Sequence, residues 1–185
     1  MRIISGRFGG RKLTNVGKGD SAAHLRPTTD RVREALFSAL EGGRYGNPIE
    51  DTHVLDLFAG SGALGLEALS RGARHVTFVE NGRKSIALLQ SNIALLDATE
   101  TRILKADALR LPKADVAANL VFLDPPYGKS LGAKALVAAS KVGWIASGAL
   151  IVWEEANPMD APEGFTLRDH RRYGDTHVSI MDAEG

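Results

Sequence analysis

The sequence contains no cysteine among its 185 residues. It can therefore form no disulfide framework, use no thiolate nucleophile and offer no cysteine-ligated metal site. It also lacks any apolar run near the roughly 18 residues that a membrane span needs, and residues 1–10 lack the apolar core of a signal peptide. The five histidines show no spacing typical of metal ligands. We therefore expect a cytoplasmic protein that uses oxygen and nitrogen chemistry, without a metal or a membrane.

The composition is that of an ordinary globular chain, with 44% hydrophobic and 24% charged residues. A length of 185 residues suits one compact domain. The net charge of +1 conceals an asymmetry. Residues 1–33 hold eight Lys and Arg against two Asp, a net charge of +6, and the remainder holds 15 against 20, a net charge of −5. This split indicates a basic arm that meets phosphates, although a solvated surface face would give the same pattern.

The basic arm and the rest of the chain show different patterns. Residues 2–14 predict a small hairpin with a turn around 8–10, and the apolar spacing after Thr29 predicts a helix that stops at Gly42 and Gly43. We divide the chain into an N-terminal extension, 1–45, and a main domain, 46–185. In the latter, short apolar strands alternate with helices, which is typical of a parallel sheet. Strands are expected at 53–58, 75–80, 101–105, 119–124 and 149–154, helices at 63–70, 83–96 and 131–142, and a C-terminal antiparallel hairpin at 165–173 and 176–182.

This order of elements predicts an α/β fold. Five crossover strands closed by a hairpin resemble the Rossmann-like, seven-stranded, mostly parallel sheet of class I methyltransferases. A plain dinucleotide-binding fold would continue with parallel units instead. The N-terminal β-hairpin and helix are additions to this sheet.

A strand that runs into a glycine-rich turn lies at residues 54–65. Gly60 and Gly62 follow Phe58 there, and glycine lets the backbone approach a ligand at the carboxyl end of the first strand. The spacing alone is a weak signal, because a tight turn beneath a packed helix has the same pattern. Glu80, at the end of the next strand, can accept both hydroxyls of a ribose. The pattern predicts a nucleoside cofactor, either a nicotinamide dinucleotide or adenosylmethionine.

Two further carboxylates bear on this choice. Asp56 ends the first strand, where a buried carboxylate is costly unless a cation or a donor pairs with it. The ammonium of a methionine moiety would serve and a pyrophosphate would be repelled, but backbone amides of the glycine turn could satisfy the carboxylate equally. Asp107, after the third strand, could accept a hydrogen bond from an adenine amino group. The predicted cofactor-binding residues, for adenosylmethionine, are Asp56, Phe58, Gly60, Gly62, Glu80, Asp107, Ala108 and, at the entry to the N-terminal helix, Thr28.

The most specific motif is Asp124, Pro125, Pro126 and Tyr127, directly after the fourth strand. It resembles the (D/N/S)-PP-(Y/F/W) motif of amino-methyltransferases. The exocyclic amine of a base is a poor nucleophile, because its lone pair is delocalised into the ring. Asp124 and the carbonyl of Pro125 can accept its two N–H bonds and aim the lone pair at a methyl group. The prolines hold that carbonyl in place, and Tyr127 offers a face for stacking.

The N-terminal arm adds a second resemblance. Residues 2–6, 10–13 and especially 26–37, with the sequence RPTTDRVREALF, are similar to the N-terminal signature of the RsmD family, bacterial 16S ribosomal RNA guanine-N2 methyltransferases. The similarity continues through 56–62 and the catalytic tetrapeptide, and so covers nearly the whole chain. The glycine turn and the tetrapeptide occur in many methyltransferases, whereas the Arg-Pro-Thr segment does not.

The resemblance implies methylation of a guanine amino group in 16S rRNA, on the small ribosomal subunit or an assembly intermediate. The motif alone does not separate guanine from adenine or cytosine. A DNA adenine-N6 methyltransferase would share the core motifs but normally needs a target-recognition insertion, and a non-enzymatic RNA-binding module would need only the arm. The residues expected to contact RNA are Arg2, Arg7, Arg11, Lys12, Arg26, Arg31 and Arg33.

Overall fold

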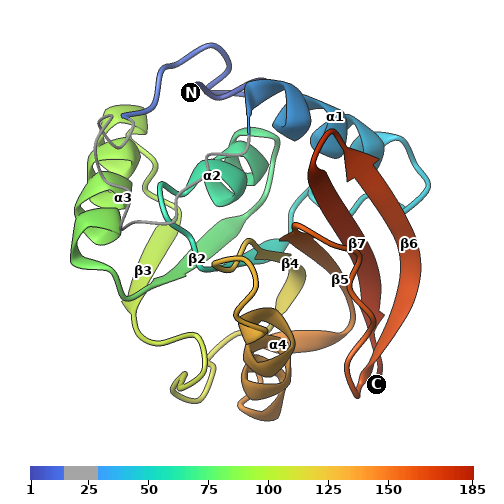
Figure 1. Ribbon diagram of the computed structural model, residues 1–185. Helices are drawn as coiled ribbons and strands as arrows, with labels where there is room; N and C mark the ends of the chain where they lie inside the picture. Colours follow the sequence, from blue (N-terminus) through green and yellow to red (C-terminus); the bar gives the residue numbers. More distant parts are fainter. Residues whose placement is uncertain (15–28) are drawn as a thin grey trace.

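A seven-stranded sheet with the order β3-β2-β1-β4-β5-β7-β6 forms the centre of the protein (Figure 1). The computed structural model describes residues 1–14 and 29–185. Strands β1 to β5 are parallel, and β7 runs antiparallel to both β5 and β6. The elements are α1 (Asp30–Glu41), β1 (His53–Leu57), α2 (Ala63–Ser70), β2 (His75–Glu80), α3 (Arg83–Leu96), β3 (Thr101–Lys105), β4 (Ala118–Leu123), α4 (Leu131–Lys141), β5 (Ile145–Glu155), β6 (Phe165–Tyr173) and β7 (Thr176–Ala183).

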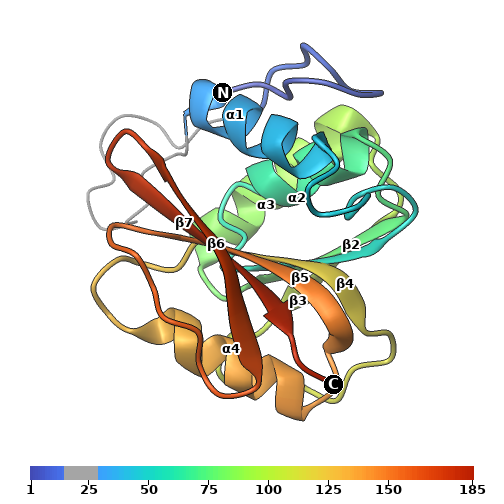
Figure 2. The ribbon, with the colours of Figure 1, turned by 90° about the vertical axis from the view of Figure 1, so that its right-hand side faces the viewer.

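Helices cover both faces of the sheet. Figure 2 shows α1, α2 and α3 on one face and α4 on the other. Each face has its own apolar core, because strands buried on both sides carry nearly continuous hydrophobic runs. Trp144 and Trp153 are buried in the core beneath α4, where they serve as packing residues. The sheet therefore leaves its strand ends, not its faces, available for a ligand.

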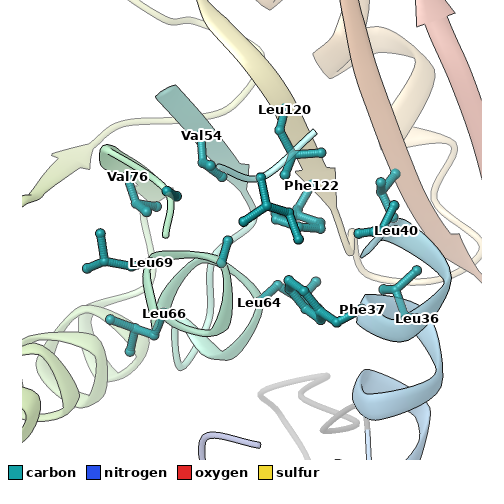
Figure 3. Close-up of a cluster of buried hydrophobic side chains, with 14 of the residues drawn as sticks. Leu36, Phe37, Leu40, Val54, Leu64, Leu66, Leu69, Val76, Leu120 and Phe122 are labelled. Carbon is teal, nitrogen blue, oxygen red and sulfur yellow. The ribbon is translucent and has the colours of Figure 1, made fainter. Parts of the chain in front are cut away.

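The N-terminal helix α1 belongs to the first of these cores. The Thr29 side chain accepts a hydrogen bond from the Val32 amide and so caps the helix. Figure 3 shows Phe37 beside Leu64 of α2, and the Phe37 and Phe122 rings lie 5.7 Å apart between centroids. The extension is thus packed continuously with the sheet through α1, while the boundary between residues 45 and 46 stays a prediction.

Residues 1–13 form the expected hairpin, although only as an isolated antiparallel bridge between Arg2 and Lys12. The hairpin is docked on α2 by polar contacts. Glu67, fully buried, accepts hydrogen bonds from the amides of Ile4 (2.8 Å) and Ser5 (3.1 Å). The Ser70 hydroxyl accepts another from the Phe8 amide at 2.9 Å. The last turn of α2 therefore holds the N-terminal segment in place.

The predicted fold is confirmed in its elements and their order, including the antiparallel β6–β7 hairpin. One boundary is wrong: β5 begins at Ile145, four residues before the expected start at Ala149. The segment contains Gly148 at φ 73°, which favours a turn in isolation, but Ala118 of β4 pairs with Ile145 across a register shift. A neighbouring strand thus overrides the local signal. Within the described residues, no helix is long and apolar enough to cross a membrane.

Candidate active site

The strand ends that carry the predicted motifs converge at one edge of the sheet. Strands β1 and β4 are neighbours there, and the chain turns outward from them in opposite directions, which is where open α/β sheets bind ligands. A cavity of about 270 Å³ lies at this edge. Predicted residues from four segments line it, namely Phe58, Glu80, Asp107, Ala108 and Pro126. Its other lining residues are Val79, Asn81, Ala106, Leu109 and Leu131, none of which the motifs singled out.

The glycine turn and Glu80 form one hydrogen-bonded unit. Glu80 Oε2 accepts from the Gly60 amide at 2.9 Å, and Oε1 accepts from the amides of Asn81 (2.9 Å) and Gly82 (2.7 Å). Phe58 adopts φ 62°, a conformation that non-glycine residues rarely take and that is common at functional turns. The carboxylate expected to bind a ribose is thus held at the cavity by three backbone donors.

Gly62 is required for a reason other than the expected one. It has φ 80° and precedes α2, and a Cβ atom added there would lie 2.4 Å from Leu89 Cδ1 of α3. The sequence interpretation was that a side chain would obstruct the ligand. The structure shows that it would first obstruct packing between the turn and α3, because the missing Cβ points into the core.

Asp56 is 2% exposed, and its Oδ2 accepts a hydrogen bond from the Gly65 amide in the first turn of α2 at 3.0 Å. Of the partners that the sequence left open, the backbone donor is therefore present. Burial, with a contribution from the Glu80 charge, raises the pKa of Asp56 to about 8, against the lowering effect of the Gly65 bond. A cation near this side chain would favour its ionised form.

Asp107 is exposed at the rim of the cavity, and Oδ1 accepts from the Leu109 amide at 2.9 Å. This bond shapes the loop after β3 and buries Ala108 in the core beneath it. Asp107 and Glu80 line the same cavity. Of the three predicted cofactor carboxylates, these two therefore meet one space, and Asp56 is not among its lining residues.

The catalytic tetrapeptide leaves β4 at the same edge. Asp124 is half-buried, Pro125 is buried, and Tyr127 is half-buried. Burial raises the pKa of Asp124 well above its ordinary value, and the nearby charges of Glu154, Asp56 and Glu155 raise it further. Burial also raises the pKa of the Tyr127 phenol, so this side chain remains a neutral donor. The site therefore concentrates carboxylates around the predicted acceptor, Asp124.

One residue of this cluster was missed by the sequence interpretation. Glu154 of β5 is 2% exposed and accepts a hydrogen bond from the Tyr127 hydroxyl at 3.2 Å. A signal for it existed, because Glu154 is the last residue of the fifth predicted strand, 149–154, and the carboxyl ends of parallel strands meet at one edge. Among the described residues, no group of three acidic or histidine side chains is arranged to hold a metal ion.

The arm arginines are engaged within the protein to different degrees. The Arg7 guanidinium donates two hydrogen bonds of 2.9 Å to the Glu100 carboxylate in a bidentate contact. This contact lowers the pKa of Glu100 to about 2. Arg11 donates to the carbonyls of Leu95 and Leu96 at the end of α3. These two residues anchor the hairpin to the main domain. Arg2, Lys12 and Arg31 are exposed.

The prediction that Arg33 contacts RNA is wrong. Its side chain is fully buried, where it donates to the Arg2 carbonyl and to Asp30, each at 2.6 Å, and lies 3.8 Å from Glu67. The sequence pattern counted its charge with the surface arm, but helix α1 turns this position toward α2. Two further predicted residues, Arg26 for RNA and Thr28 for the cofactor, lie outside the described residues.

The chain is similar to known proteins along nearly its whole length. Residues 1–182 match the family described as conserved hypothetical protein 95. The chain is 43% identical, over its full length, to ribosomal RNA small subunit methyltransferase D of Escherichia coli, of which the match covers 90%. The chain belongs to the RsmD family. A relative in Bacillus subtilis, putative rRNA methyltransferase YlbH, is 34% identical with both chains fully covered.

Solved structures agree with this assignment to the RsmD family. Putative methyltransferase yhhF from Escherichia coli superposes with a TM-score of 0.83 at 38% identity, covering all of this chain and 98% of that one. A putative methylase from Haemophilus influenzae gives a TM-score of 0.75 at 31% identity, covering 100% and 98% of the two chains. The chain is therefore a methyltransferase with the Rossmann-like fold, a class that in general uses adenosylmethionine.

Proposed function

We propose that this enzyme transfers the methyl group of adenosylmethionine to the exocyclic N2 amino group of a guanine in 16S rRNA. The substrate would be the small ribosomal subunit or an assembly intermediate, in the cytoplasm. The observation that carries the proposal is the position of Asp124-Pro125-Pro126-Tyr127 beside the cavity that Glu80 and Asp107 line. The choice of 16S guanine rests on the family resemblance and on relatives named for the small subunit rRNA.

The cavity suits adenosylmethionine in the chemistry of its residues. Glu80 offers acceptors for ribose hydroxyls, Asp107 offers one for an adenine amino group, and Phe58 and Leu131 add apolar surface. Asp56, behind the glycine turn, supplies a carboxyl group whose ionisation a ligand cation would favour. The bound cofactor would supply an electrophilic methyl group on a sulfonium.

The protein residues activate the nucleophile. Asp124 and the Pro125 carbonyl accept the two N–H bonds of the target amine, so that its lone pair points at the methyl carbon. The cofactor would supply the methyl carbon of the new N–C bond, and the electron pair of the broken C–S bond would stay on its sulfur. The product nitrogen then gives its extra proton to Asp124, which passes it to solvent. Tyr127 stacks on the base and holds it in the plane that this geometry requires.

The DNA methyltransferase alternative needs a unit for reading duplex sequence. From His53 to Ala183 every residue is described, and the longest connection between successive elements is the loop 106–117. This loop is shorter than a target-recognition unit. RNA loops, in contrast, present bases that are already unstacked, so an added domain for opening a duplex is unnecessary.

Mass-spectrometric mapping tests the proposed function directly. 16S rRNA from a strain lacking the protein should lack one N2-methylguanine, which purified protein with adenosylmethionine should restore on isolated small subunits. Duplex DNA, offered in parallel, should remain unmodified. Methylation of DNA adenine, or of another base in the RNA, would contradict the proposal.

Replacement of Glu80 by alanine should weaken adenosylmethionine binding by about tenfold or more. The change removes a charged acceptor for the ribose and releases the Gly60 amide, and hydrogen bonds to charged groups contribute about 1.5–3 kcal/mol. Calorimetric titration with adenosylmethionine measures the effect. Asp115→Ala serves as the control, because Asp115 is an exposed carboxylate paired with Arg102 and does not line the cavity. Equal affinity in both variants would contradict the assigned cofactor site.

Replacement of both Lys12 and Arg31 by alanine should weaken rRNA binding and its dependence on salt. Each lost phosphate contact should lower the slope of log affinity against log salt by about 0.7–0.9. These exposed residues test RNA contact without disturbing the anchors Arg7 and Arg11. The matched control is the double variant Lys134→Ala and Lys141→Ala, on exposed positions of α4 across the sheet (Figure 2). If both double variants changed the slope equally, the arm would not be the RNA surface.

A further inference from the structure

Glu154 lies beside the catalytic tetrapeptide without belonging to it. In the parallel pair β4–β5, Leu123 is in register with Trp153, so Asp124 and Glu154 are the next residues on the two strands. Glu154 is 2% exposed, a costly position for a carboxylate. An apolar side chain at this position of β5 would pack equally well without the free-energy cost of burying a carboxylate. Packing alone therefore does not explain a glutamate here.

A direct contact joins this residue to the motif. The Tyr127 hydroxyl donates to Glu154 Oε1 at 3.2 Å, from a loop that continues through Gly128 at φ 74° into α4. A hydrogen bond at the far end of the ring restricts both side-chain torsions of Tyr127. The ring is thereby held in one orientation before a base arrives, which lowers the entropy cost of stacking.

The second link between Glu154 and the motif is electrostatic. Among the described residues, the carboxylates that act on Asp124 come from two strands, and the phenol that interacts with it comes from its own loop. Two carboxylates close together in a buried site cannot both ionise cheaply, so each disfavours the charge of the other. The N–H groups of a bound base have the opposite effect on Asp124, because hydrogen bonds donated to a carboxylate favour its ionised form. The carboxylates are Glu154 and Glu155 of β5 and Asp56 of β1, and the phenol is that of Tyr127. On the neighbouring strand β7, His177 is in register with Glu155.

We propose that Glu154 is a positioning residue for methyl transfer: it holds the Tyr127 ring through the hydroxyl and places a second carboxylate beside Asp124. The inference rests on the proposed function for its kinetic consequence only. Without a target base the neighbouring carboxylate disfavours the ionised form of Asp124, and the N–H groups of the target favour the carboxylate that accepts them. Glu154 thus makes the ionisation of Asp124 depend on the substrate.

The electrostatic half of the proposal is tested without activity. In the cofactor-free protein, the carboxyl carbon of Asp124 is followed by NMR against pH and assigned by its absence in Asp124→Asn. Glu154→Gln removes the neighbouring charge and should move the titration of Asp124 to lower pH. Glu155→Gln should move it less, since Glu155 contributes less to the shift. An unmoved titration in Glu154→Gln overturns this half, whether or not the protein methylates rRNA.

The positioning half is tested by kinetics. In Glu154→Gln, the amide oxygen still accepts from the Tyr127 hydroxyl, and the acidic limb of kcat/KM against pH should move to lower pH. Glu154→Leu removes the acceptor and should lower kcat about tenfold, the effect of one such hydrogen bond. Tyr127→Phe should lower kcat similarly, and the double variant should be no worse than the single ones. Additive losses overturn the proposal. If Glu154→Leu does not fold, the same cycle is run with Glu154→Met, which also lacks the acceptor oxygen and has a similar volume.

Discussion

Replacing Asp124 by alanine should lower the rate of methyl transfer by a hundredfold or more. In the proposed mechanism this carboxylate is aimed at the target amine before the reaction, and loss of such a pre-oriented group typically costs about 3–4 kcal/mol of barrier. Single-turnover methylation of small subunits at saturating adenosylmethionine measures the step. The rate of Asp124→Asn should lie between those of the parent protein and Asp124→Ala, because its amide retains one acceptor oxygen.

The same variant should bind adenosylmethionine nearly as tightly as the parent protein. Asp124 does not line the cavity assigned to the cofactor, whereas Pro126 does. Calorimetry on Asp124→Ala therefore separates a chemical defect from a binding defect. Near-normal turnover in this variant would overturn the assigned mechanism, and a large loss of cofactor affinity would place Asp124 in the cofactor site instead.

Replacing Glu67 by alanine should lower the free energy of unfolding by about 3–5 kcal/mol, the usual cost of breaking a buried ion pair. Glu67 Oε1 accepts from Arg71 Nε at 2.7 Å, and Oε2 lies 3.8 Å from Arg33, also fully buried. The change would leave Arg33 without this carboxylate and remove the acceptor for the Ile4 and Ser5 amides. Urea unfolding curves measure the loss.

Two further variants show which interactions of Glu67 stabilise the protein. Glu67→Gln keeps acceptor oxygens for the hairpin amides but loses the charge, so it should be intermediate. Glu100→Ala breaks the exposed contact with Arg7, and should change stability far less, because solvent screens exposed pairs. If Glu67→Ala lost no more stability than Glu100→Ala, the hairpin would not depend on the buried network.

Much of the fold was predictable because its signals are local. The alternation of short apolar strands with helices located five strands, and the turn between 173 and 176 located the two of the C-terminal hairpin. Thr29 marked the start of α1, where its side chain caps the helix. The β5 boundary was misplaced because Gly148 reads as a turn, whereas pairing with β4 extends the strand past it. Pairing between segments distant in sequence leaves no local pattern to detect.

By itself, the sequence determined the fold class. It also predicted a catalytic role for residues 124–127 and a ligand site at the strand ends that carry carboxylates. Each of these follows from residues adjacent in the chain, or from the rule that parallel strands end at one edge. Only the tertiary structure decided which charged side chains face inward. It buried Arg33 beside Glu67, engaged Arg7 with Glu100, and brought Glu154 to Tyr127 across 27 positions of sequence. A sequence does not show whether a charged side chain faces the solvent or the core, because that depends on how the helices and strands pack.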